Sequence, residues 1–351
     1  MVDTVTEDSL EVRAMDEFKS LGYNLIDAYT PNREDLKDST GRTNKDQVVL
    51  SQVLIQSLKE INPHIPGEII HDEAKAIIED ASLNSKLLKD KNYERYQDIL
   101  NGIKVKFRRE GKETIEYLNL IDYENPKNNT FTVARQVWID GEYGYRRPDI
   151  LVYINGLPLV WIELKKPSEN VQLGYTYNLI NQKHDIPQLF FFNQLCIISN
   201  GHQTKAGSYN SSFSHYFEWL KVDDEKEKID RKMIDNNEIS LQYLIKGLMP
   251  KEKIIDYIEN FILYLNKDTK IVAKSHQFIG VNNAIDSFKN RDGKNGKLGV
   301  FWHTQGSGKS FSMVMYVRKI RRKYSGNYTF LMITDRDDLN TQLLKNFVRT
   351  G

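Results

Sequence analysis

The segment that most constrains the fold of this chain is a glycine-rich run between an apolar stretch and a helical pattern. Residues 303–310 read His-Thr-Gln-Gly-Ser-Gly-Lys-Ser. The apolar run 298–302 before it predicts a buried strand, and the apolar spacing of 311–317 predicts a helix. In this context the backbone N–H groups of such a loop and the helix N-terminus face a phosphate. A chance glycine-rich helix cap is the alternative, and the agreement of strand, loop and helix argues against it.

The residues of this loop have distinct expected roles. Lys309 would reach the β- and γ-phosphates of a nucleotide, and Ser310 would hold its Mg²⁺. His303 stands where the pattern G-x-x-x-x-G-K-[ST] begins with glycine. A second apolar run, 328–334, predicts a further strand of a parallel nucleotide-binding sheet. The expected nucleotide-binding residues of the loop are Thr304, Gln305, Gly306, Ser307, Gly308, Lys309 and Ser310.

A second group of charged residues borders a predicted hairpin earlier in the chain. Asp149 precedes the apolar run 150–154, and Glu163 and Lys165 lie at the end of the next run. Asn155-Gly156 between the runs is a strong hairpin signal. A three-residue loop would place Asp149 opposite Glu163, whereas a two-residue loop would slip the register and separate the carboxylates onto opposite faces. Lys165 shares the face of Glu163 in either case, because the side chains of a strand alternate.

The apolar residues on both faces of this hairpin predict a central, buried position. Buried charges are costly unless they are paired or hold a metal. Asp149 and Glu163 offer the oxygen ligands that Mg²⁺ prefers. The ion would activate a bound water and stabilise charge on a phosphodiester, and Lys165 would position that water. A salt-bridged sheet end without chemistry is the alternative. The pattern favours a metal-dependent nuclease site.

Both motifs resemble one protein family. Arg147-Pro148-Asp149 and 163–167 (Glu-Leu-Lys-Lys-Pro) look like the PD-(D/E)xK nuclease core of the restriction (R) subunit of type I restriction–modification enzymes, and the loop with His303 is similar to the P-loop of the same subunit. The resemblance implies an α/β fold: a restriction-endonuclease-like PD-(D/E)xK domain, then the start of a RecA-like helicase domain of superfamily 2. It also implies that Gln277 contacts adenine and that Glu11 supports the nuclease site. Asp335-Arg336 resembles the next helicase motif.

The family implies an ATP-dependent endonuclease of the type I site-specific kind. Such a subunit translocates double-stranded DNA with ATP, cuts it with Mg²⁺, and docks on modification and specificity subunits. Catalysis would fall to Asp149, Glu163 and Lys165. The family motif Gln-x-x-x-Tyr falls on Asn178 and Gln182 here, so this auxiliary element stays outside the expected catalytic set. Before Gly351 no Walker B pair is recognised, and we therefore expect the N-terminal part of a longer motor protein.

The expected organisation is a nuclease domain over 1–222, a charged linker with bridging helices over 223–265, and the first part of a motor over 266–351. Helices are expected over 72–88, 174–185, 240–248 and 251–264, and the charge-dense linker itself over 223–237. The basic run 319–323 is expected to end the helix after the glycine-rich loop, where cations suit the helix dipole. The alternatives are a superfamily 2 helicase or remodeller whose N-terminal domain only binds DNA, and a regulatory ATP-binding module. A net charge of +1 leaves no global basic field, so DNA contact would be local. No apolar stretch is long enough to span a bilayer, and we expect a cytoplasmic protein without membrane partners. Expected local basic patches are 104–109, 146–147 and 165–166.

Overall fold

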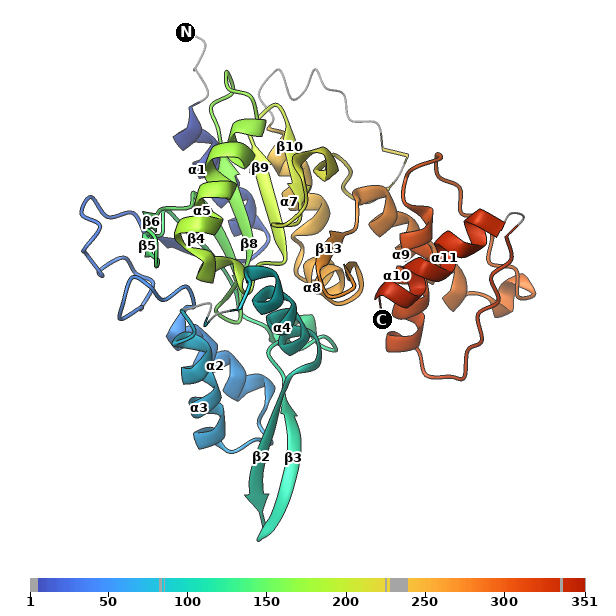
Figure 1. The fold of residues 1–351 in the computed structure, drawn as a ribbon, viewed down its shortest axis with the longest axis horizontal. Helices are drawn as coiled ribbons and strands as arrows, with labels where there is room; N and C mark the ends of the chain where they lie inside the picture. Colours follow the sequence, from blue (N-terminus) through green and yellow to red (C-terminus); the bar gives the residue numbers. More distant parts are fainter. Residues whose placement is uncertain are drawn as a thin grey trace.

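A central mixed sheet organises the molecule (Figure 1). The computed structural model describes residues 6–81, 84, 86–224, 226–227, 239–334 and 337–350. The sheet has seven strands in the order β1-β4-β7-β8-β9-β10-β11. β1 is parallel to β4 and β8 is parallel to β9, while the other neighbours are antiparallel. In sheet order the strands are Asn24–Asp27, Phe131–Arg135, Ile150–Ile154, Leu157–Leu164, Leu195–Ser199, Thr204–Gly207 and Phe217–Glu218.

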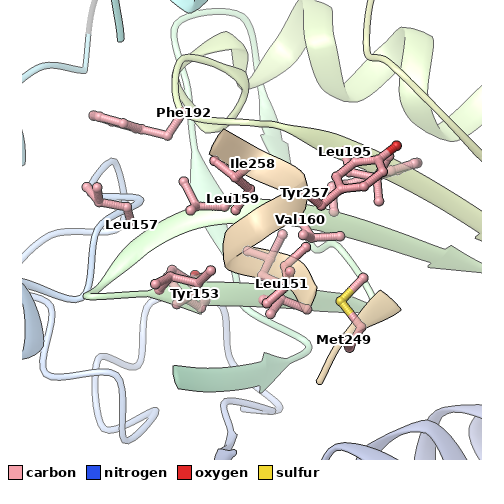
Figure 2. Packing of buried hydrophobic residues seen from close by; sticks show 14 of the residues in the cluster. Leu151, Tyr153, Leu157, Leu159, Val160, Phe192, Leu195, Met249, Tyr257 and Ile258 are labelled. Atoms are coloured by element: carbon pink, nitrogen blue, oxygen red, sulfur yellow. The ribbon is translucent and has the colours of Figure 1, made fainter. Parts of the chain in front are cut away.

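The middle of this sheet is fully buried. Every residue of β7, β8 and β9 is buried. Helix α1 (Glu7–Ser20) packs on β4 and β8, and the helical segment 174–185 packs on β8 and β9. Figure 2 shows part of the apolar core that surrounds these strands. The predicted central hairpin is therefore confirmed, and charged groups at its end lie beside a water-poor interior.

The helical segment over the sheet begins with a wide turn. Gly174–Leu179 forms a π-helix that runs into α5 (Ile180–Asp185). A Cβ on Gly174 would lie 2.5 Å from Cγ2 of Ile198, so only glycine allows the helix this close to β9. The helix predicted over 174–185 is confirmed, and its close approach carries Gln182 onto the strand that bears Glu163.

Two elements near the sheet differ from the expected ones. The helix predicted over 72–88 is instead α3 (Gly67–Ile78), which follows α2 (Ser51–Ile61), and a separate α4 (Leu88–Asn101) begins where the prediction ended. After α4, β2 (Ile103–Arg109) pairs with β3 (Lys112–Leu118) in a hairpin that projects from the body in Figure 1. The sequence did not predict α4 because residues 88–101 are mostly polar and offer few apolar positions at helical spacing. A shorter hairpin, β5 (Ile139–Asp140) and β6 (Tyr145–Arg146), precedes Asp149.

Helices dominate the C-terminal part of the chain. The helices predicted over 240–248 and 251–264 are α7 (Ser240–Leu248) and α8 (Lys251–Asn260). The end of the second prediction is wrong, because Ile262–Leu265 forms β12 and pairs with β13 (Thr269–Val272). Most of the predicted linker 223–237 lies outside the described residues. The remaining helices are α9 (Ser275–Lys289), α10 (Lys309–Lys323) and α11 (Asp337–Thr350).

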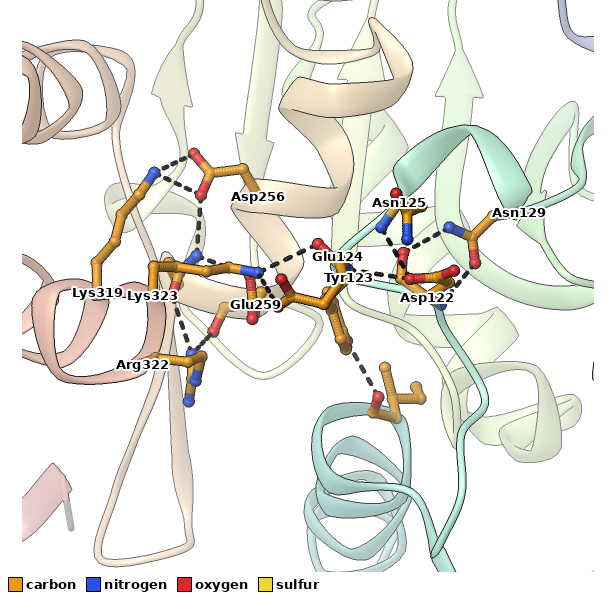
Figure 3. A network of polar contacts seen from close by, with 12 residues as sticks. Asp122, Tyr123, Glu124, Asn125, Asn129, Asp256, Glu259, Lys319, Arg322 and Lys323 are labelled. Atoms are coloured by element: carbon orange, nitrogen blue, oxygen red, sulfur yellow. Dashed lines mark hydrogen bonds and ion pairs between the residues drawn. The ribbon is translucent and has the colours of Figure 1, made fainter. Parts of the chain in front are cut away.

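The C-terminal end of α10 is tied to the rest of the molecule by charged contacts (Figure 3). Lys319 pairs with Asp256 of α8 at 2.5 Å. Lys323 pairs with Glu259 of α8 at 2.9 Å and with Glu124, beside the sheet domain, at 3.2 Å. The cations expected at this helix end are therefore more than partners for the helix dipole: they join three segments that are distant in the sequence.

The two strands predicted around the glycine-rich loop are not formed. The runs 298–302 and 328–334 have no strand partner among the described residues, and both are coil. Val300 is 94% exposed and Leu331 is 83% exposed. An apolar run becomes a strand only when a neighbouring strand takes up its backbone N–H and C=O groups, and no such ladder forms here. The two strands predicted at 298–302 and 328–334 are therefore wrong for the described residues.

Candidate active site and phosphate-binding loop

The hairpin that carries the acidic residues combines a tight turn with a bulge. Asn155 and Gly156 both have positive φ, 52° and 81°, and Ile154 pairs with Leu157 across a two-residue turn. That turn alone would put the carboxylates on opposite faces. A register shift between Val152 and Tyr153 gives β8 one additional residue, so that Ile150 pairs with Ile162. The register then brings Asp149 opposite Glu163, as the three-residue alternative required, but by a different route.

Asp149, Glu163 and Lys165 meet at one end of the sheet. Oδ2 of Asp149 accepts a hydrogen bond from the backbone N–H of Leu164 at 2.7 Å. Nζ of Lys165 donates to Oε1 of Glu163 at 3.1 Å and to the carbonyl of Leu164 at 2.6 Å. Glu163 is 2% exposed, and Asp149 and Lys165 are half-buried. The structure therefore brings the three expected residues together.

Helix α1 adds two carboxylates to this end of the sheet. Oε1 of Glu7 accepts a hydrogen bond from Lys165 Nζ at 3.3 Å. The side-chain amide of Gln136 donates to Glu11 at 2.8 Å and to Asp149 at 3.3 Å, and so connects the helix with the site. Gln136 has a left-handed backbone with φ of 57°, unusual for a residue with a side chain. The expectation that Glu11 supports the site thus has a physical basis, namely the bridge through Gln136.

The helix after the hairpin also reaches the site. Nε2 of Gln182 donates to Oε2 of Glu163 at 3.1 Å, and Oε1 of Gln182 accepts from the indole N–H of Trp161 at 2.8 Å. Trp161 fixes which end of the amide faces the carboxylate, because the indole can only donate. Gln182, which was left outside the expected catalytic set, therefore contacts Glu163 of that set directly.

The surroundings hold the carboxyl groups near protonation. Burial raises the pKa of Asp149 to about 6 and that of Glu11 to about 7. Burial and the nearby charge of Asp149 raise the pKa of Glu163 well above its usual value. Burial lowers the pKa of Lys165, but the carboxylates of Glu163, Asp149 and Glu7 outweigh burial and leave this pKa above its ordinary value. Negative charge here is thus poorly compensated by the protein alone.

A divalent cation fits this donor set. Among the described residues no group of three or more His, Cys, Asp or Glu side chains is arranged to hold a metal. Mg²⁺ needs fewer, because it keeps several waters and is commonly held by one or two carboxylates. Asp149 and Glu163 provide two such groups, and their raised pKa values are those expected where a compensating positive charge would stabilise them.

The glycine-rich loop leads directly into α10, which begins at Lys309. Gly306 and Gly308 have φ of 78° and 86°, so the loop depends on the backbone freedom of glycine. Nζ of Lys309 donates to the carbonyls of His303 and Thr304 at 2.8 and 3.0 Å. The ammonium therefore lies inside the loop, where a phosphate would replace the two carbonyls. Residues 304–306 are exposed and 307–310 are half-buried.

Gln277 lies against the loop from α9. Its Nε2 donates to the carbonyl of Gly308 at 3.0 Å, and its Oε1 accepts from the backbone N–H of Lys274 at 2.9 Å. The side chain is buried, so both ends of its amide serve the protein in this conformation. Asp335 and Arg336, assigned to the next helicase motif, lie outside the described residues.

Sequence reasoning missed three of the residues around the acidic site. Glu7 lies in the first turn of α1. Acidic residues are common there because they interact favourably with the helix dipole, so Glu7 alone gives no functional signal. Gln136 follows a strand end with no motif around it. Gln182 was set aside because a glutamine stands at the family's tyrosine position, yet its amide contacts Glu163 directly.

Comparisons with known proteins agree with the two-part organisation. Residues 4–215 match the family described as type I restriction enzyme R protein N terminus. Residues 276–351 match the family described as SWI2/SNF2 ATPase. The second match covers the glycine-rich loop and identifies a SWI2/SNF2 ATPase segment, which implies ATP as its nucleotide.

Curated relatives resemble the chain along nearly its whole length. The type I restriction enzyme HindI endonuclease subunit of Haemophilus influenzae is 33% identical over 353 residues, covering 98% of this chain and 33% of that protein. The putative type I restriction enzyme MjaIXP endonuclease subunit of Methanocaldococcus jannaschii is 32% identical over 362 residues, covering 96% and 34%. The chain thus spans about a third of the length of these relatives. None of the described helices has the length and apolarity to cross a bilayer.

Proposed function

Because the chain belongs to the family of type I restriction enzyme R proteins, we propose that its sheet domain is a Mg²⁺-dependent DNA endonuclease and that its C-terminal segment binds ATP to drive a DNA translocase. The fold assignments are a PD-(D/E)xK core over 1–222, a connecting region over 223–265 and part of a RecA-like superfamily 2 domain over 266–351. The observation that carries the proposal is the meeting of Asp149, Glu163 and Lys165 across the register of β7 and β8.

Each residue of the proposed nuclease site has one task. Asp149 and Glu163 would hold Mg²⁺, which polarises a water and a phosphodiester oxygen when bound. Lys165, held by Glu163 and Glu7, would orient the attacking water and stabilise negative charge on the phosphate. Gln136 and Gln182 fix the orientation of the two carboxylates by hydrogen bonds. Cleavage by this set breaks one P–O bond of the backbone, and water supplies the new oxygen.

The nucleotide site follows from the loop and α10. Residues 304–308 would surround the phosphates with backbone N–H groups, Lys309 would pair with the β- and γ-phosphates, and Ser310 would hold the Mg²⁺ of ATP. Gln277 would contact adenine once the nucleotide has displaced its bond to Gly308. Double-stranded DNA and the modification and specificity subunits of a type I complex are the proposed partners, because the relatives are subunits of type I restriction enzymes.

The test is DNA cleavage by the protein and by matched variants. Plasmid is incubated with the chain and Mg²⁺ or Mn²⁺, and in parallel with the full-length protein, its partner subunits and ATP. Asp149→Asn, Glu163→Gln and Lys165→Ala should abolish cutting, while Lys127→Ala should retain it, since Lys127 is an exposed lysine outside the expected basic patches. Cutting that survives Glu163→Gln in the full complex would overturn the proposal. DNA binding without cutting there would favour the alternative, a helicase or remodeller whose N-terminal domain only binds DNA.

A further inference from the structure

An unusual group of side chains lies beside the proposed nuclease site. Arg147 is placed between two aromatic rings: its Cζ lies 4.8 Å from the ring centre of Trp138 and 5.3 Å from that of Tyr29. The ring of Trp138 contacts that of Tyr145 at 5.8 Å, and Arg33 lies 4.2 Å over Tyr145. We call these five residues the arginine–aromatic cluster. None of them has a role in the cleavage chemistry described above.

The topology of the sheet places the cluster next to the acidic residues. Arg147 precedes Asp149 by two residues, and Trp138 follows Gln136, which donates to Asp149, by two residues. Tyr29 follows the end of β1, whose last residue is paired with the last residue of β4. The ends of β1, β4 and β8 and the start of β7 share one end of the sheet. A polymer leaving the carboxylates in this direction would therefore cross the cluster.

The two adjacent arginines are in different electrostatic situations. Arg146 is paired with Asp185 at 2.5 Å. Among the described residues no carboxylate pairs with Arg147. A guanidinium that lies over two aromatic rings, with its N–H groups not taken up by a carboxylate among the described residues, is suited to bind a phosphate with two parallel hydrogen bonds.

Two of the three aromatic members are exposed. Tyr29 is 53% exposed and Tyr145 is 52% exposed. The backbone beside them is held by hydrogen bonds: the indole N–H of Trp138 donates to the carbonyl of Thr30 at 3.4 Å, and buried Arg42 donates to the carbonyl of Trp138 at 3.0 Å. Exposed aromatic rings beside a cation are an arrangement on which unstacked bases of a nucleic acid strand bind.

We propose that the arginine–aromatic cluster is a DNA-strand subsite, in which Arg147 binds a backbone phosphate and Tyr29 and Tyr145 stack on bases next to the cleaved bond. This rests on the proposed nuclease function. The cluster positions the strand and takes no part in bond cleavage. It favours a strand that is unpaired near the cut over an intact duplex, because stacking on a side chain requires a base that has left the helix.

The test measures DNA binding separately from cutting. A fluorescein-labelled single-stranded oligonucleotide and the matching duplex are titrated with the chain in EDTA, and the dissociation constant is read from anisotropy at several salt concentrations. Arg147→Ala and Tyr29→Leu should each weaken single-strand binding roughly five- to tenfold, with a smaller loss for the duplex. The salt slope should decrease by about 0.7 in Arg147→Ala alone. Arg147→Lys should restore the salt slope but not the full affinity, because lysine keeps the positive charge and lacks the planar guanidinium group.

Matched controls separate this proposal from loss of structure. Tyr117→Leu removes a tyrosine of similar exposure, 54%, from the distant β2–β3 hairpin and should bind as wild type. Tyr145→Leu gives a second aromatic test if Tyr29→Leu is unstable by thermal melting. Wild-type affinity in both tyrosine variants and in Arg147→Ala, or no single-strand binding by the wild type, would overturn the subsite. If binding needs the cluster but Glu163→Gln still cuts in the full complex, the nuclease proposal fails and the subsite stands.

Discussion

Gln182 donates a hydrogen bond from Nε2 to Oε2 of Glu163, and the indole of Trp161 fixes the direction of that bond. This bond lowers the pKa of Glu163 against the effect of burial. Gln182→Met removes the donor while keeping the volume, so ionisation of Glu163 should need a higher pH. We expect the pH–rate profile of cleavage to move to higher pH, with the rate at neutral pH reduced about tenfold, the effect of one hydrogen bond to a charged group.

The control for this prediction is Asn178→Ala, one turn earlier on the same helical segment and half-buried. The assay uses whichever assembly cuts DNA, the chain alone or the full complex. An unchanged profile in Gln182→Met would show that the bond has no influence on the ionisation of Glu163.

The geometry around Glu163 shows how far the sequence could predict the site. Asn155-Gly156 predicted the turn, and the apolar runs predicted burial. Asp149 lies opposite Glu163 only because a bulge between Val152 and Tyr153 shifts the register of the hairpin. Both strands are apolar on both faces, so no alternation of polar and apolar residues marks the register or the additional residue. The resemblance to a family named three residues that the structure brings together, whereas the sequence pattern alone left two registers open.

Asp149 should make stability depend on pH when no metal is present. Its pKa is raised to about 6 by burial, so the folded state holds this proton more tightly than the unfolded chain. The resulting stabilisation is present below the ordinary pKa near 4 and is lost as the pH rises through about 6. Residue 149 of the Asp149→Asn variant does not titrate. The free energy of unfolding of this variant, relative to wild type, should therefore increase from pH 4 to above pH 6 by roughly 2–3 kcal/mol at most. Urea unfolding of both proteins in EDTA from pH 4 to 8 measures the difference.

A divalent cation should reverse this effect. Ca²⁺ or Mn²⁺ should raise the melting temperature of the wild type more at pH 8 than at pH 5.5, because binding requires Asp149 and Glu163 to lose their protons. Asp149→Asn and Glu163→Gln should abolish the increase, and Glu142→Gln, an exposed carboxylate, should not. A stabilisation by metal that is independent of pH would mean that the ion binds elsewhere.

Nucleotide binding should require both Lys309 and a change of partner by Gln277. We expect Lys309→Ala to weaken binding of a fluorescent ATP analogue with Mg²⁺ by about tenfold or more, the loss of one charge-assisted phosphate contact. Gln277→Glu keeps the acceptor for the N–H of Lys274 but loses the donor to the carbonyl of Gly308. It should weaken binding more than Lys294→Ala, a lysine on the exposed turn after α9. Equal affinity of Gln277→Glu and wild type would remove Gln277 from the nucleotide site.

The loop also shows why part of the fold was not predictable. The runs 298–302 and 328–334 have strand composition, but strand formation depends on partners from other parts of a protein. Among the described residues neither run has a partner, and Val300 and Leu331 are largely exposed. The helix after the loop needed no such partner, since its hydrogen bonds are internal, and α10 (Lys309–Lys323) covers the predicted run 311–317.

The ion pair between Lys319 and Asp256 should hold α10 on α8 and contribute measurably to stability. The side chains are 11% and 22% exposed, and Nζ also donates to Asn282 at 2.6 Å. Among the described residues, removal of the cation in Lys319→Met leaves Asp256 with the amide donors of Asn260 and Asn282. We expect a loss of about 1–3 kcal/mol in the free energy of unfolding, less than for a fully buried pair because water reaches Asp256.

Urea unfolding of Lys319→Met, Asp256→Asn and the double variant gives the coupling energy between the two residues. The comparison is Lys289→Met, whose pair with Asp286 is about half exposed on both sides and should change stability by less than about 1 kcal/mol. If Lys319→Met behaves like Lys289→Met, the contact is a surface pair without structural consequence. A coupling energy clearly above that of an exposed pair would instead mean that the helix carrying the phosphate-binding lysine is held to α8 at its far end, and that Lys323 and Glu124 extend this connection to the sheet domain.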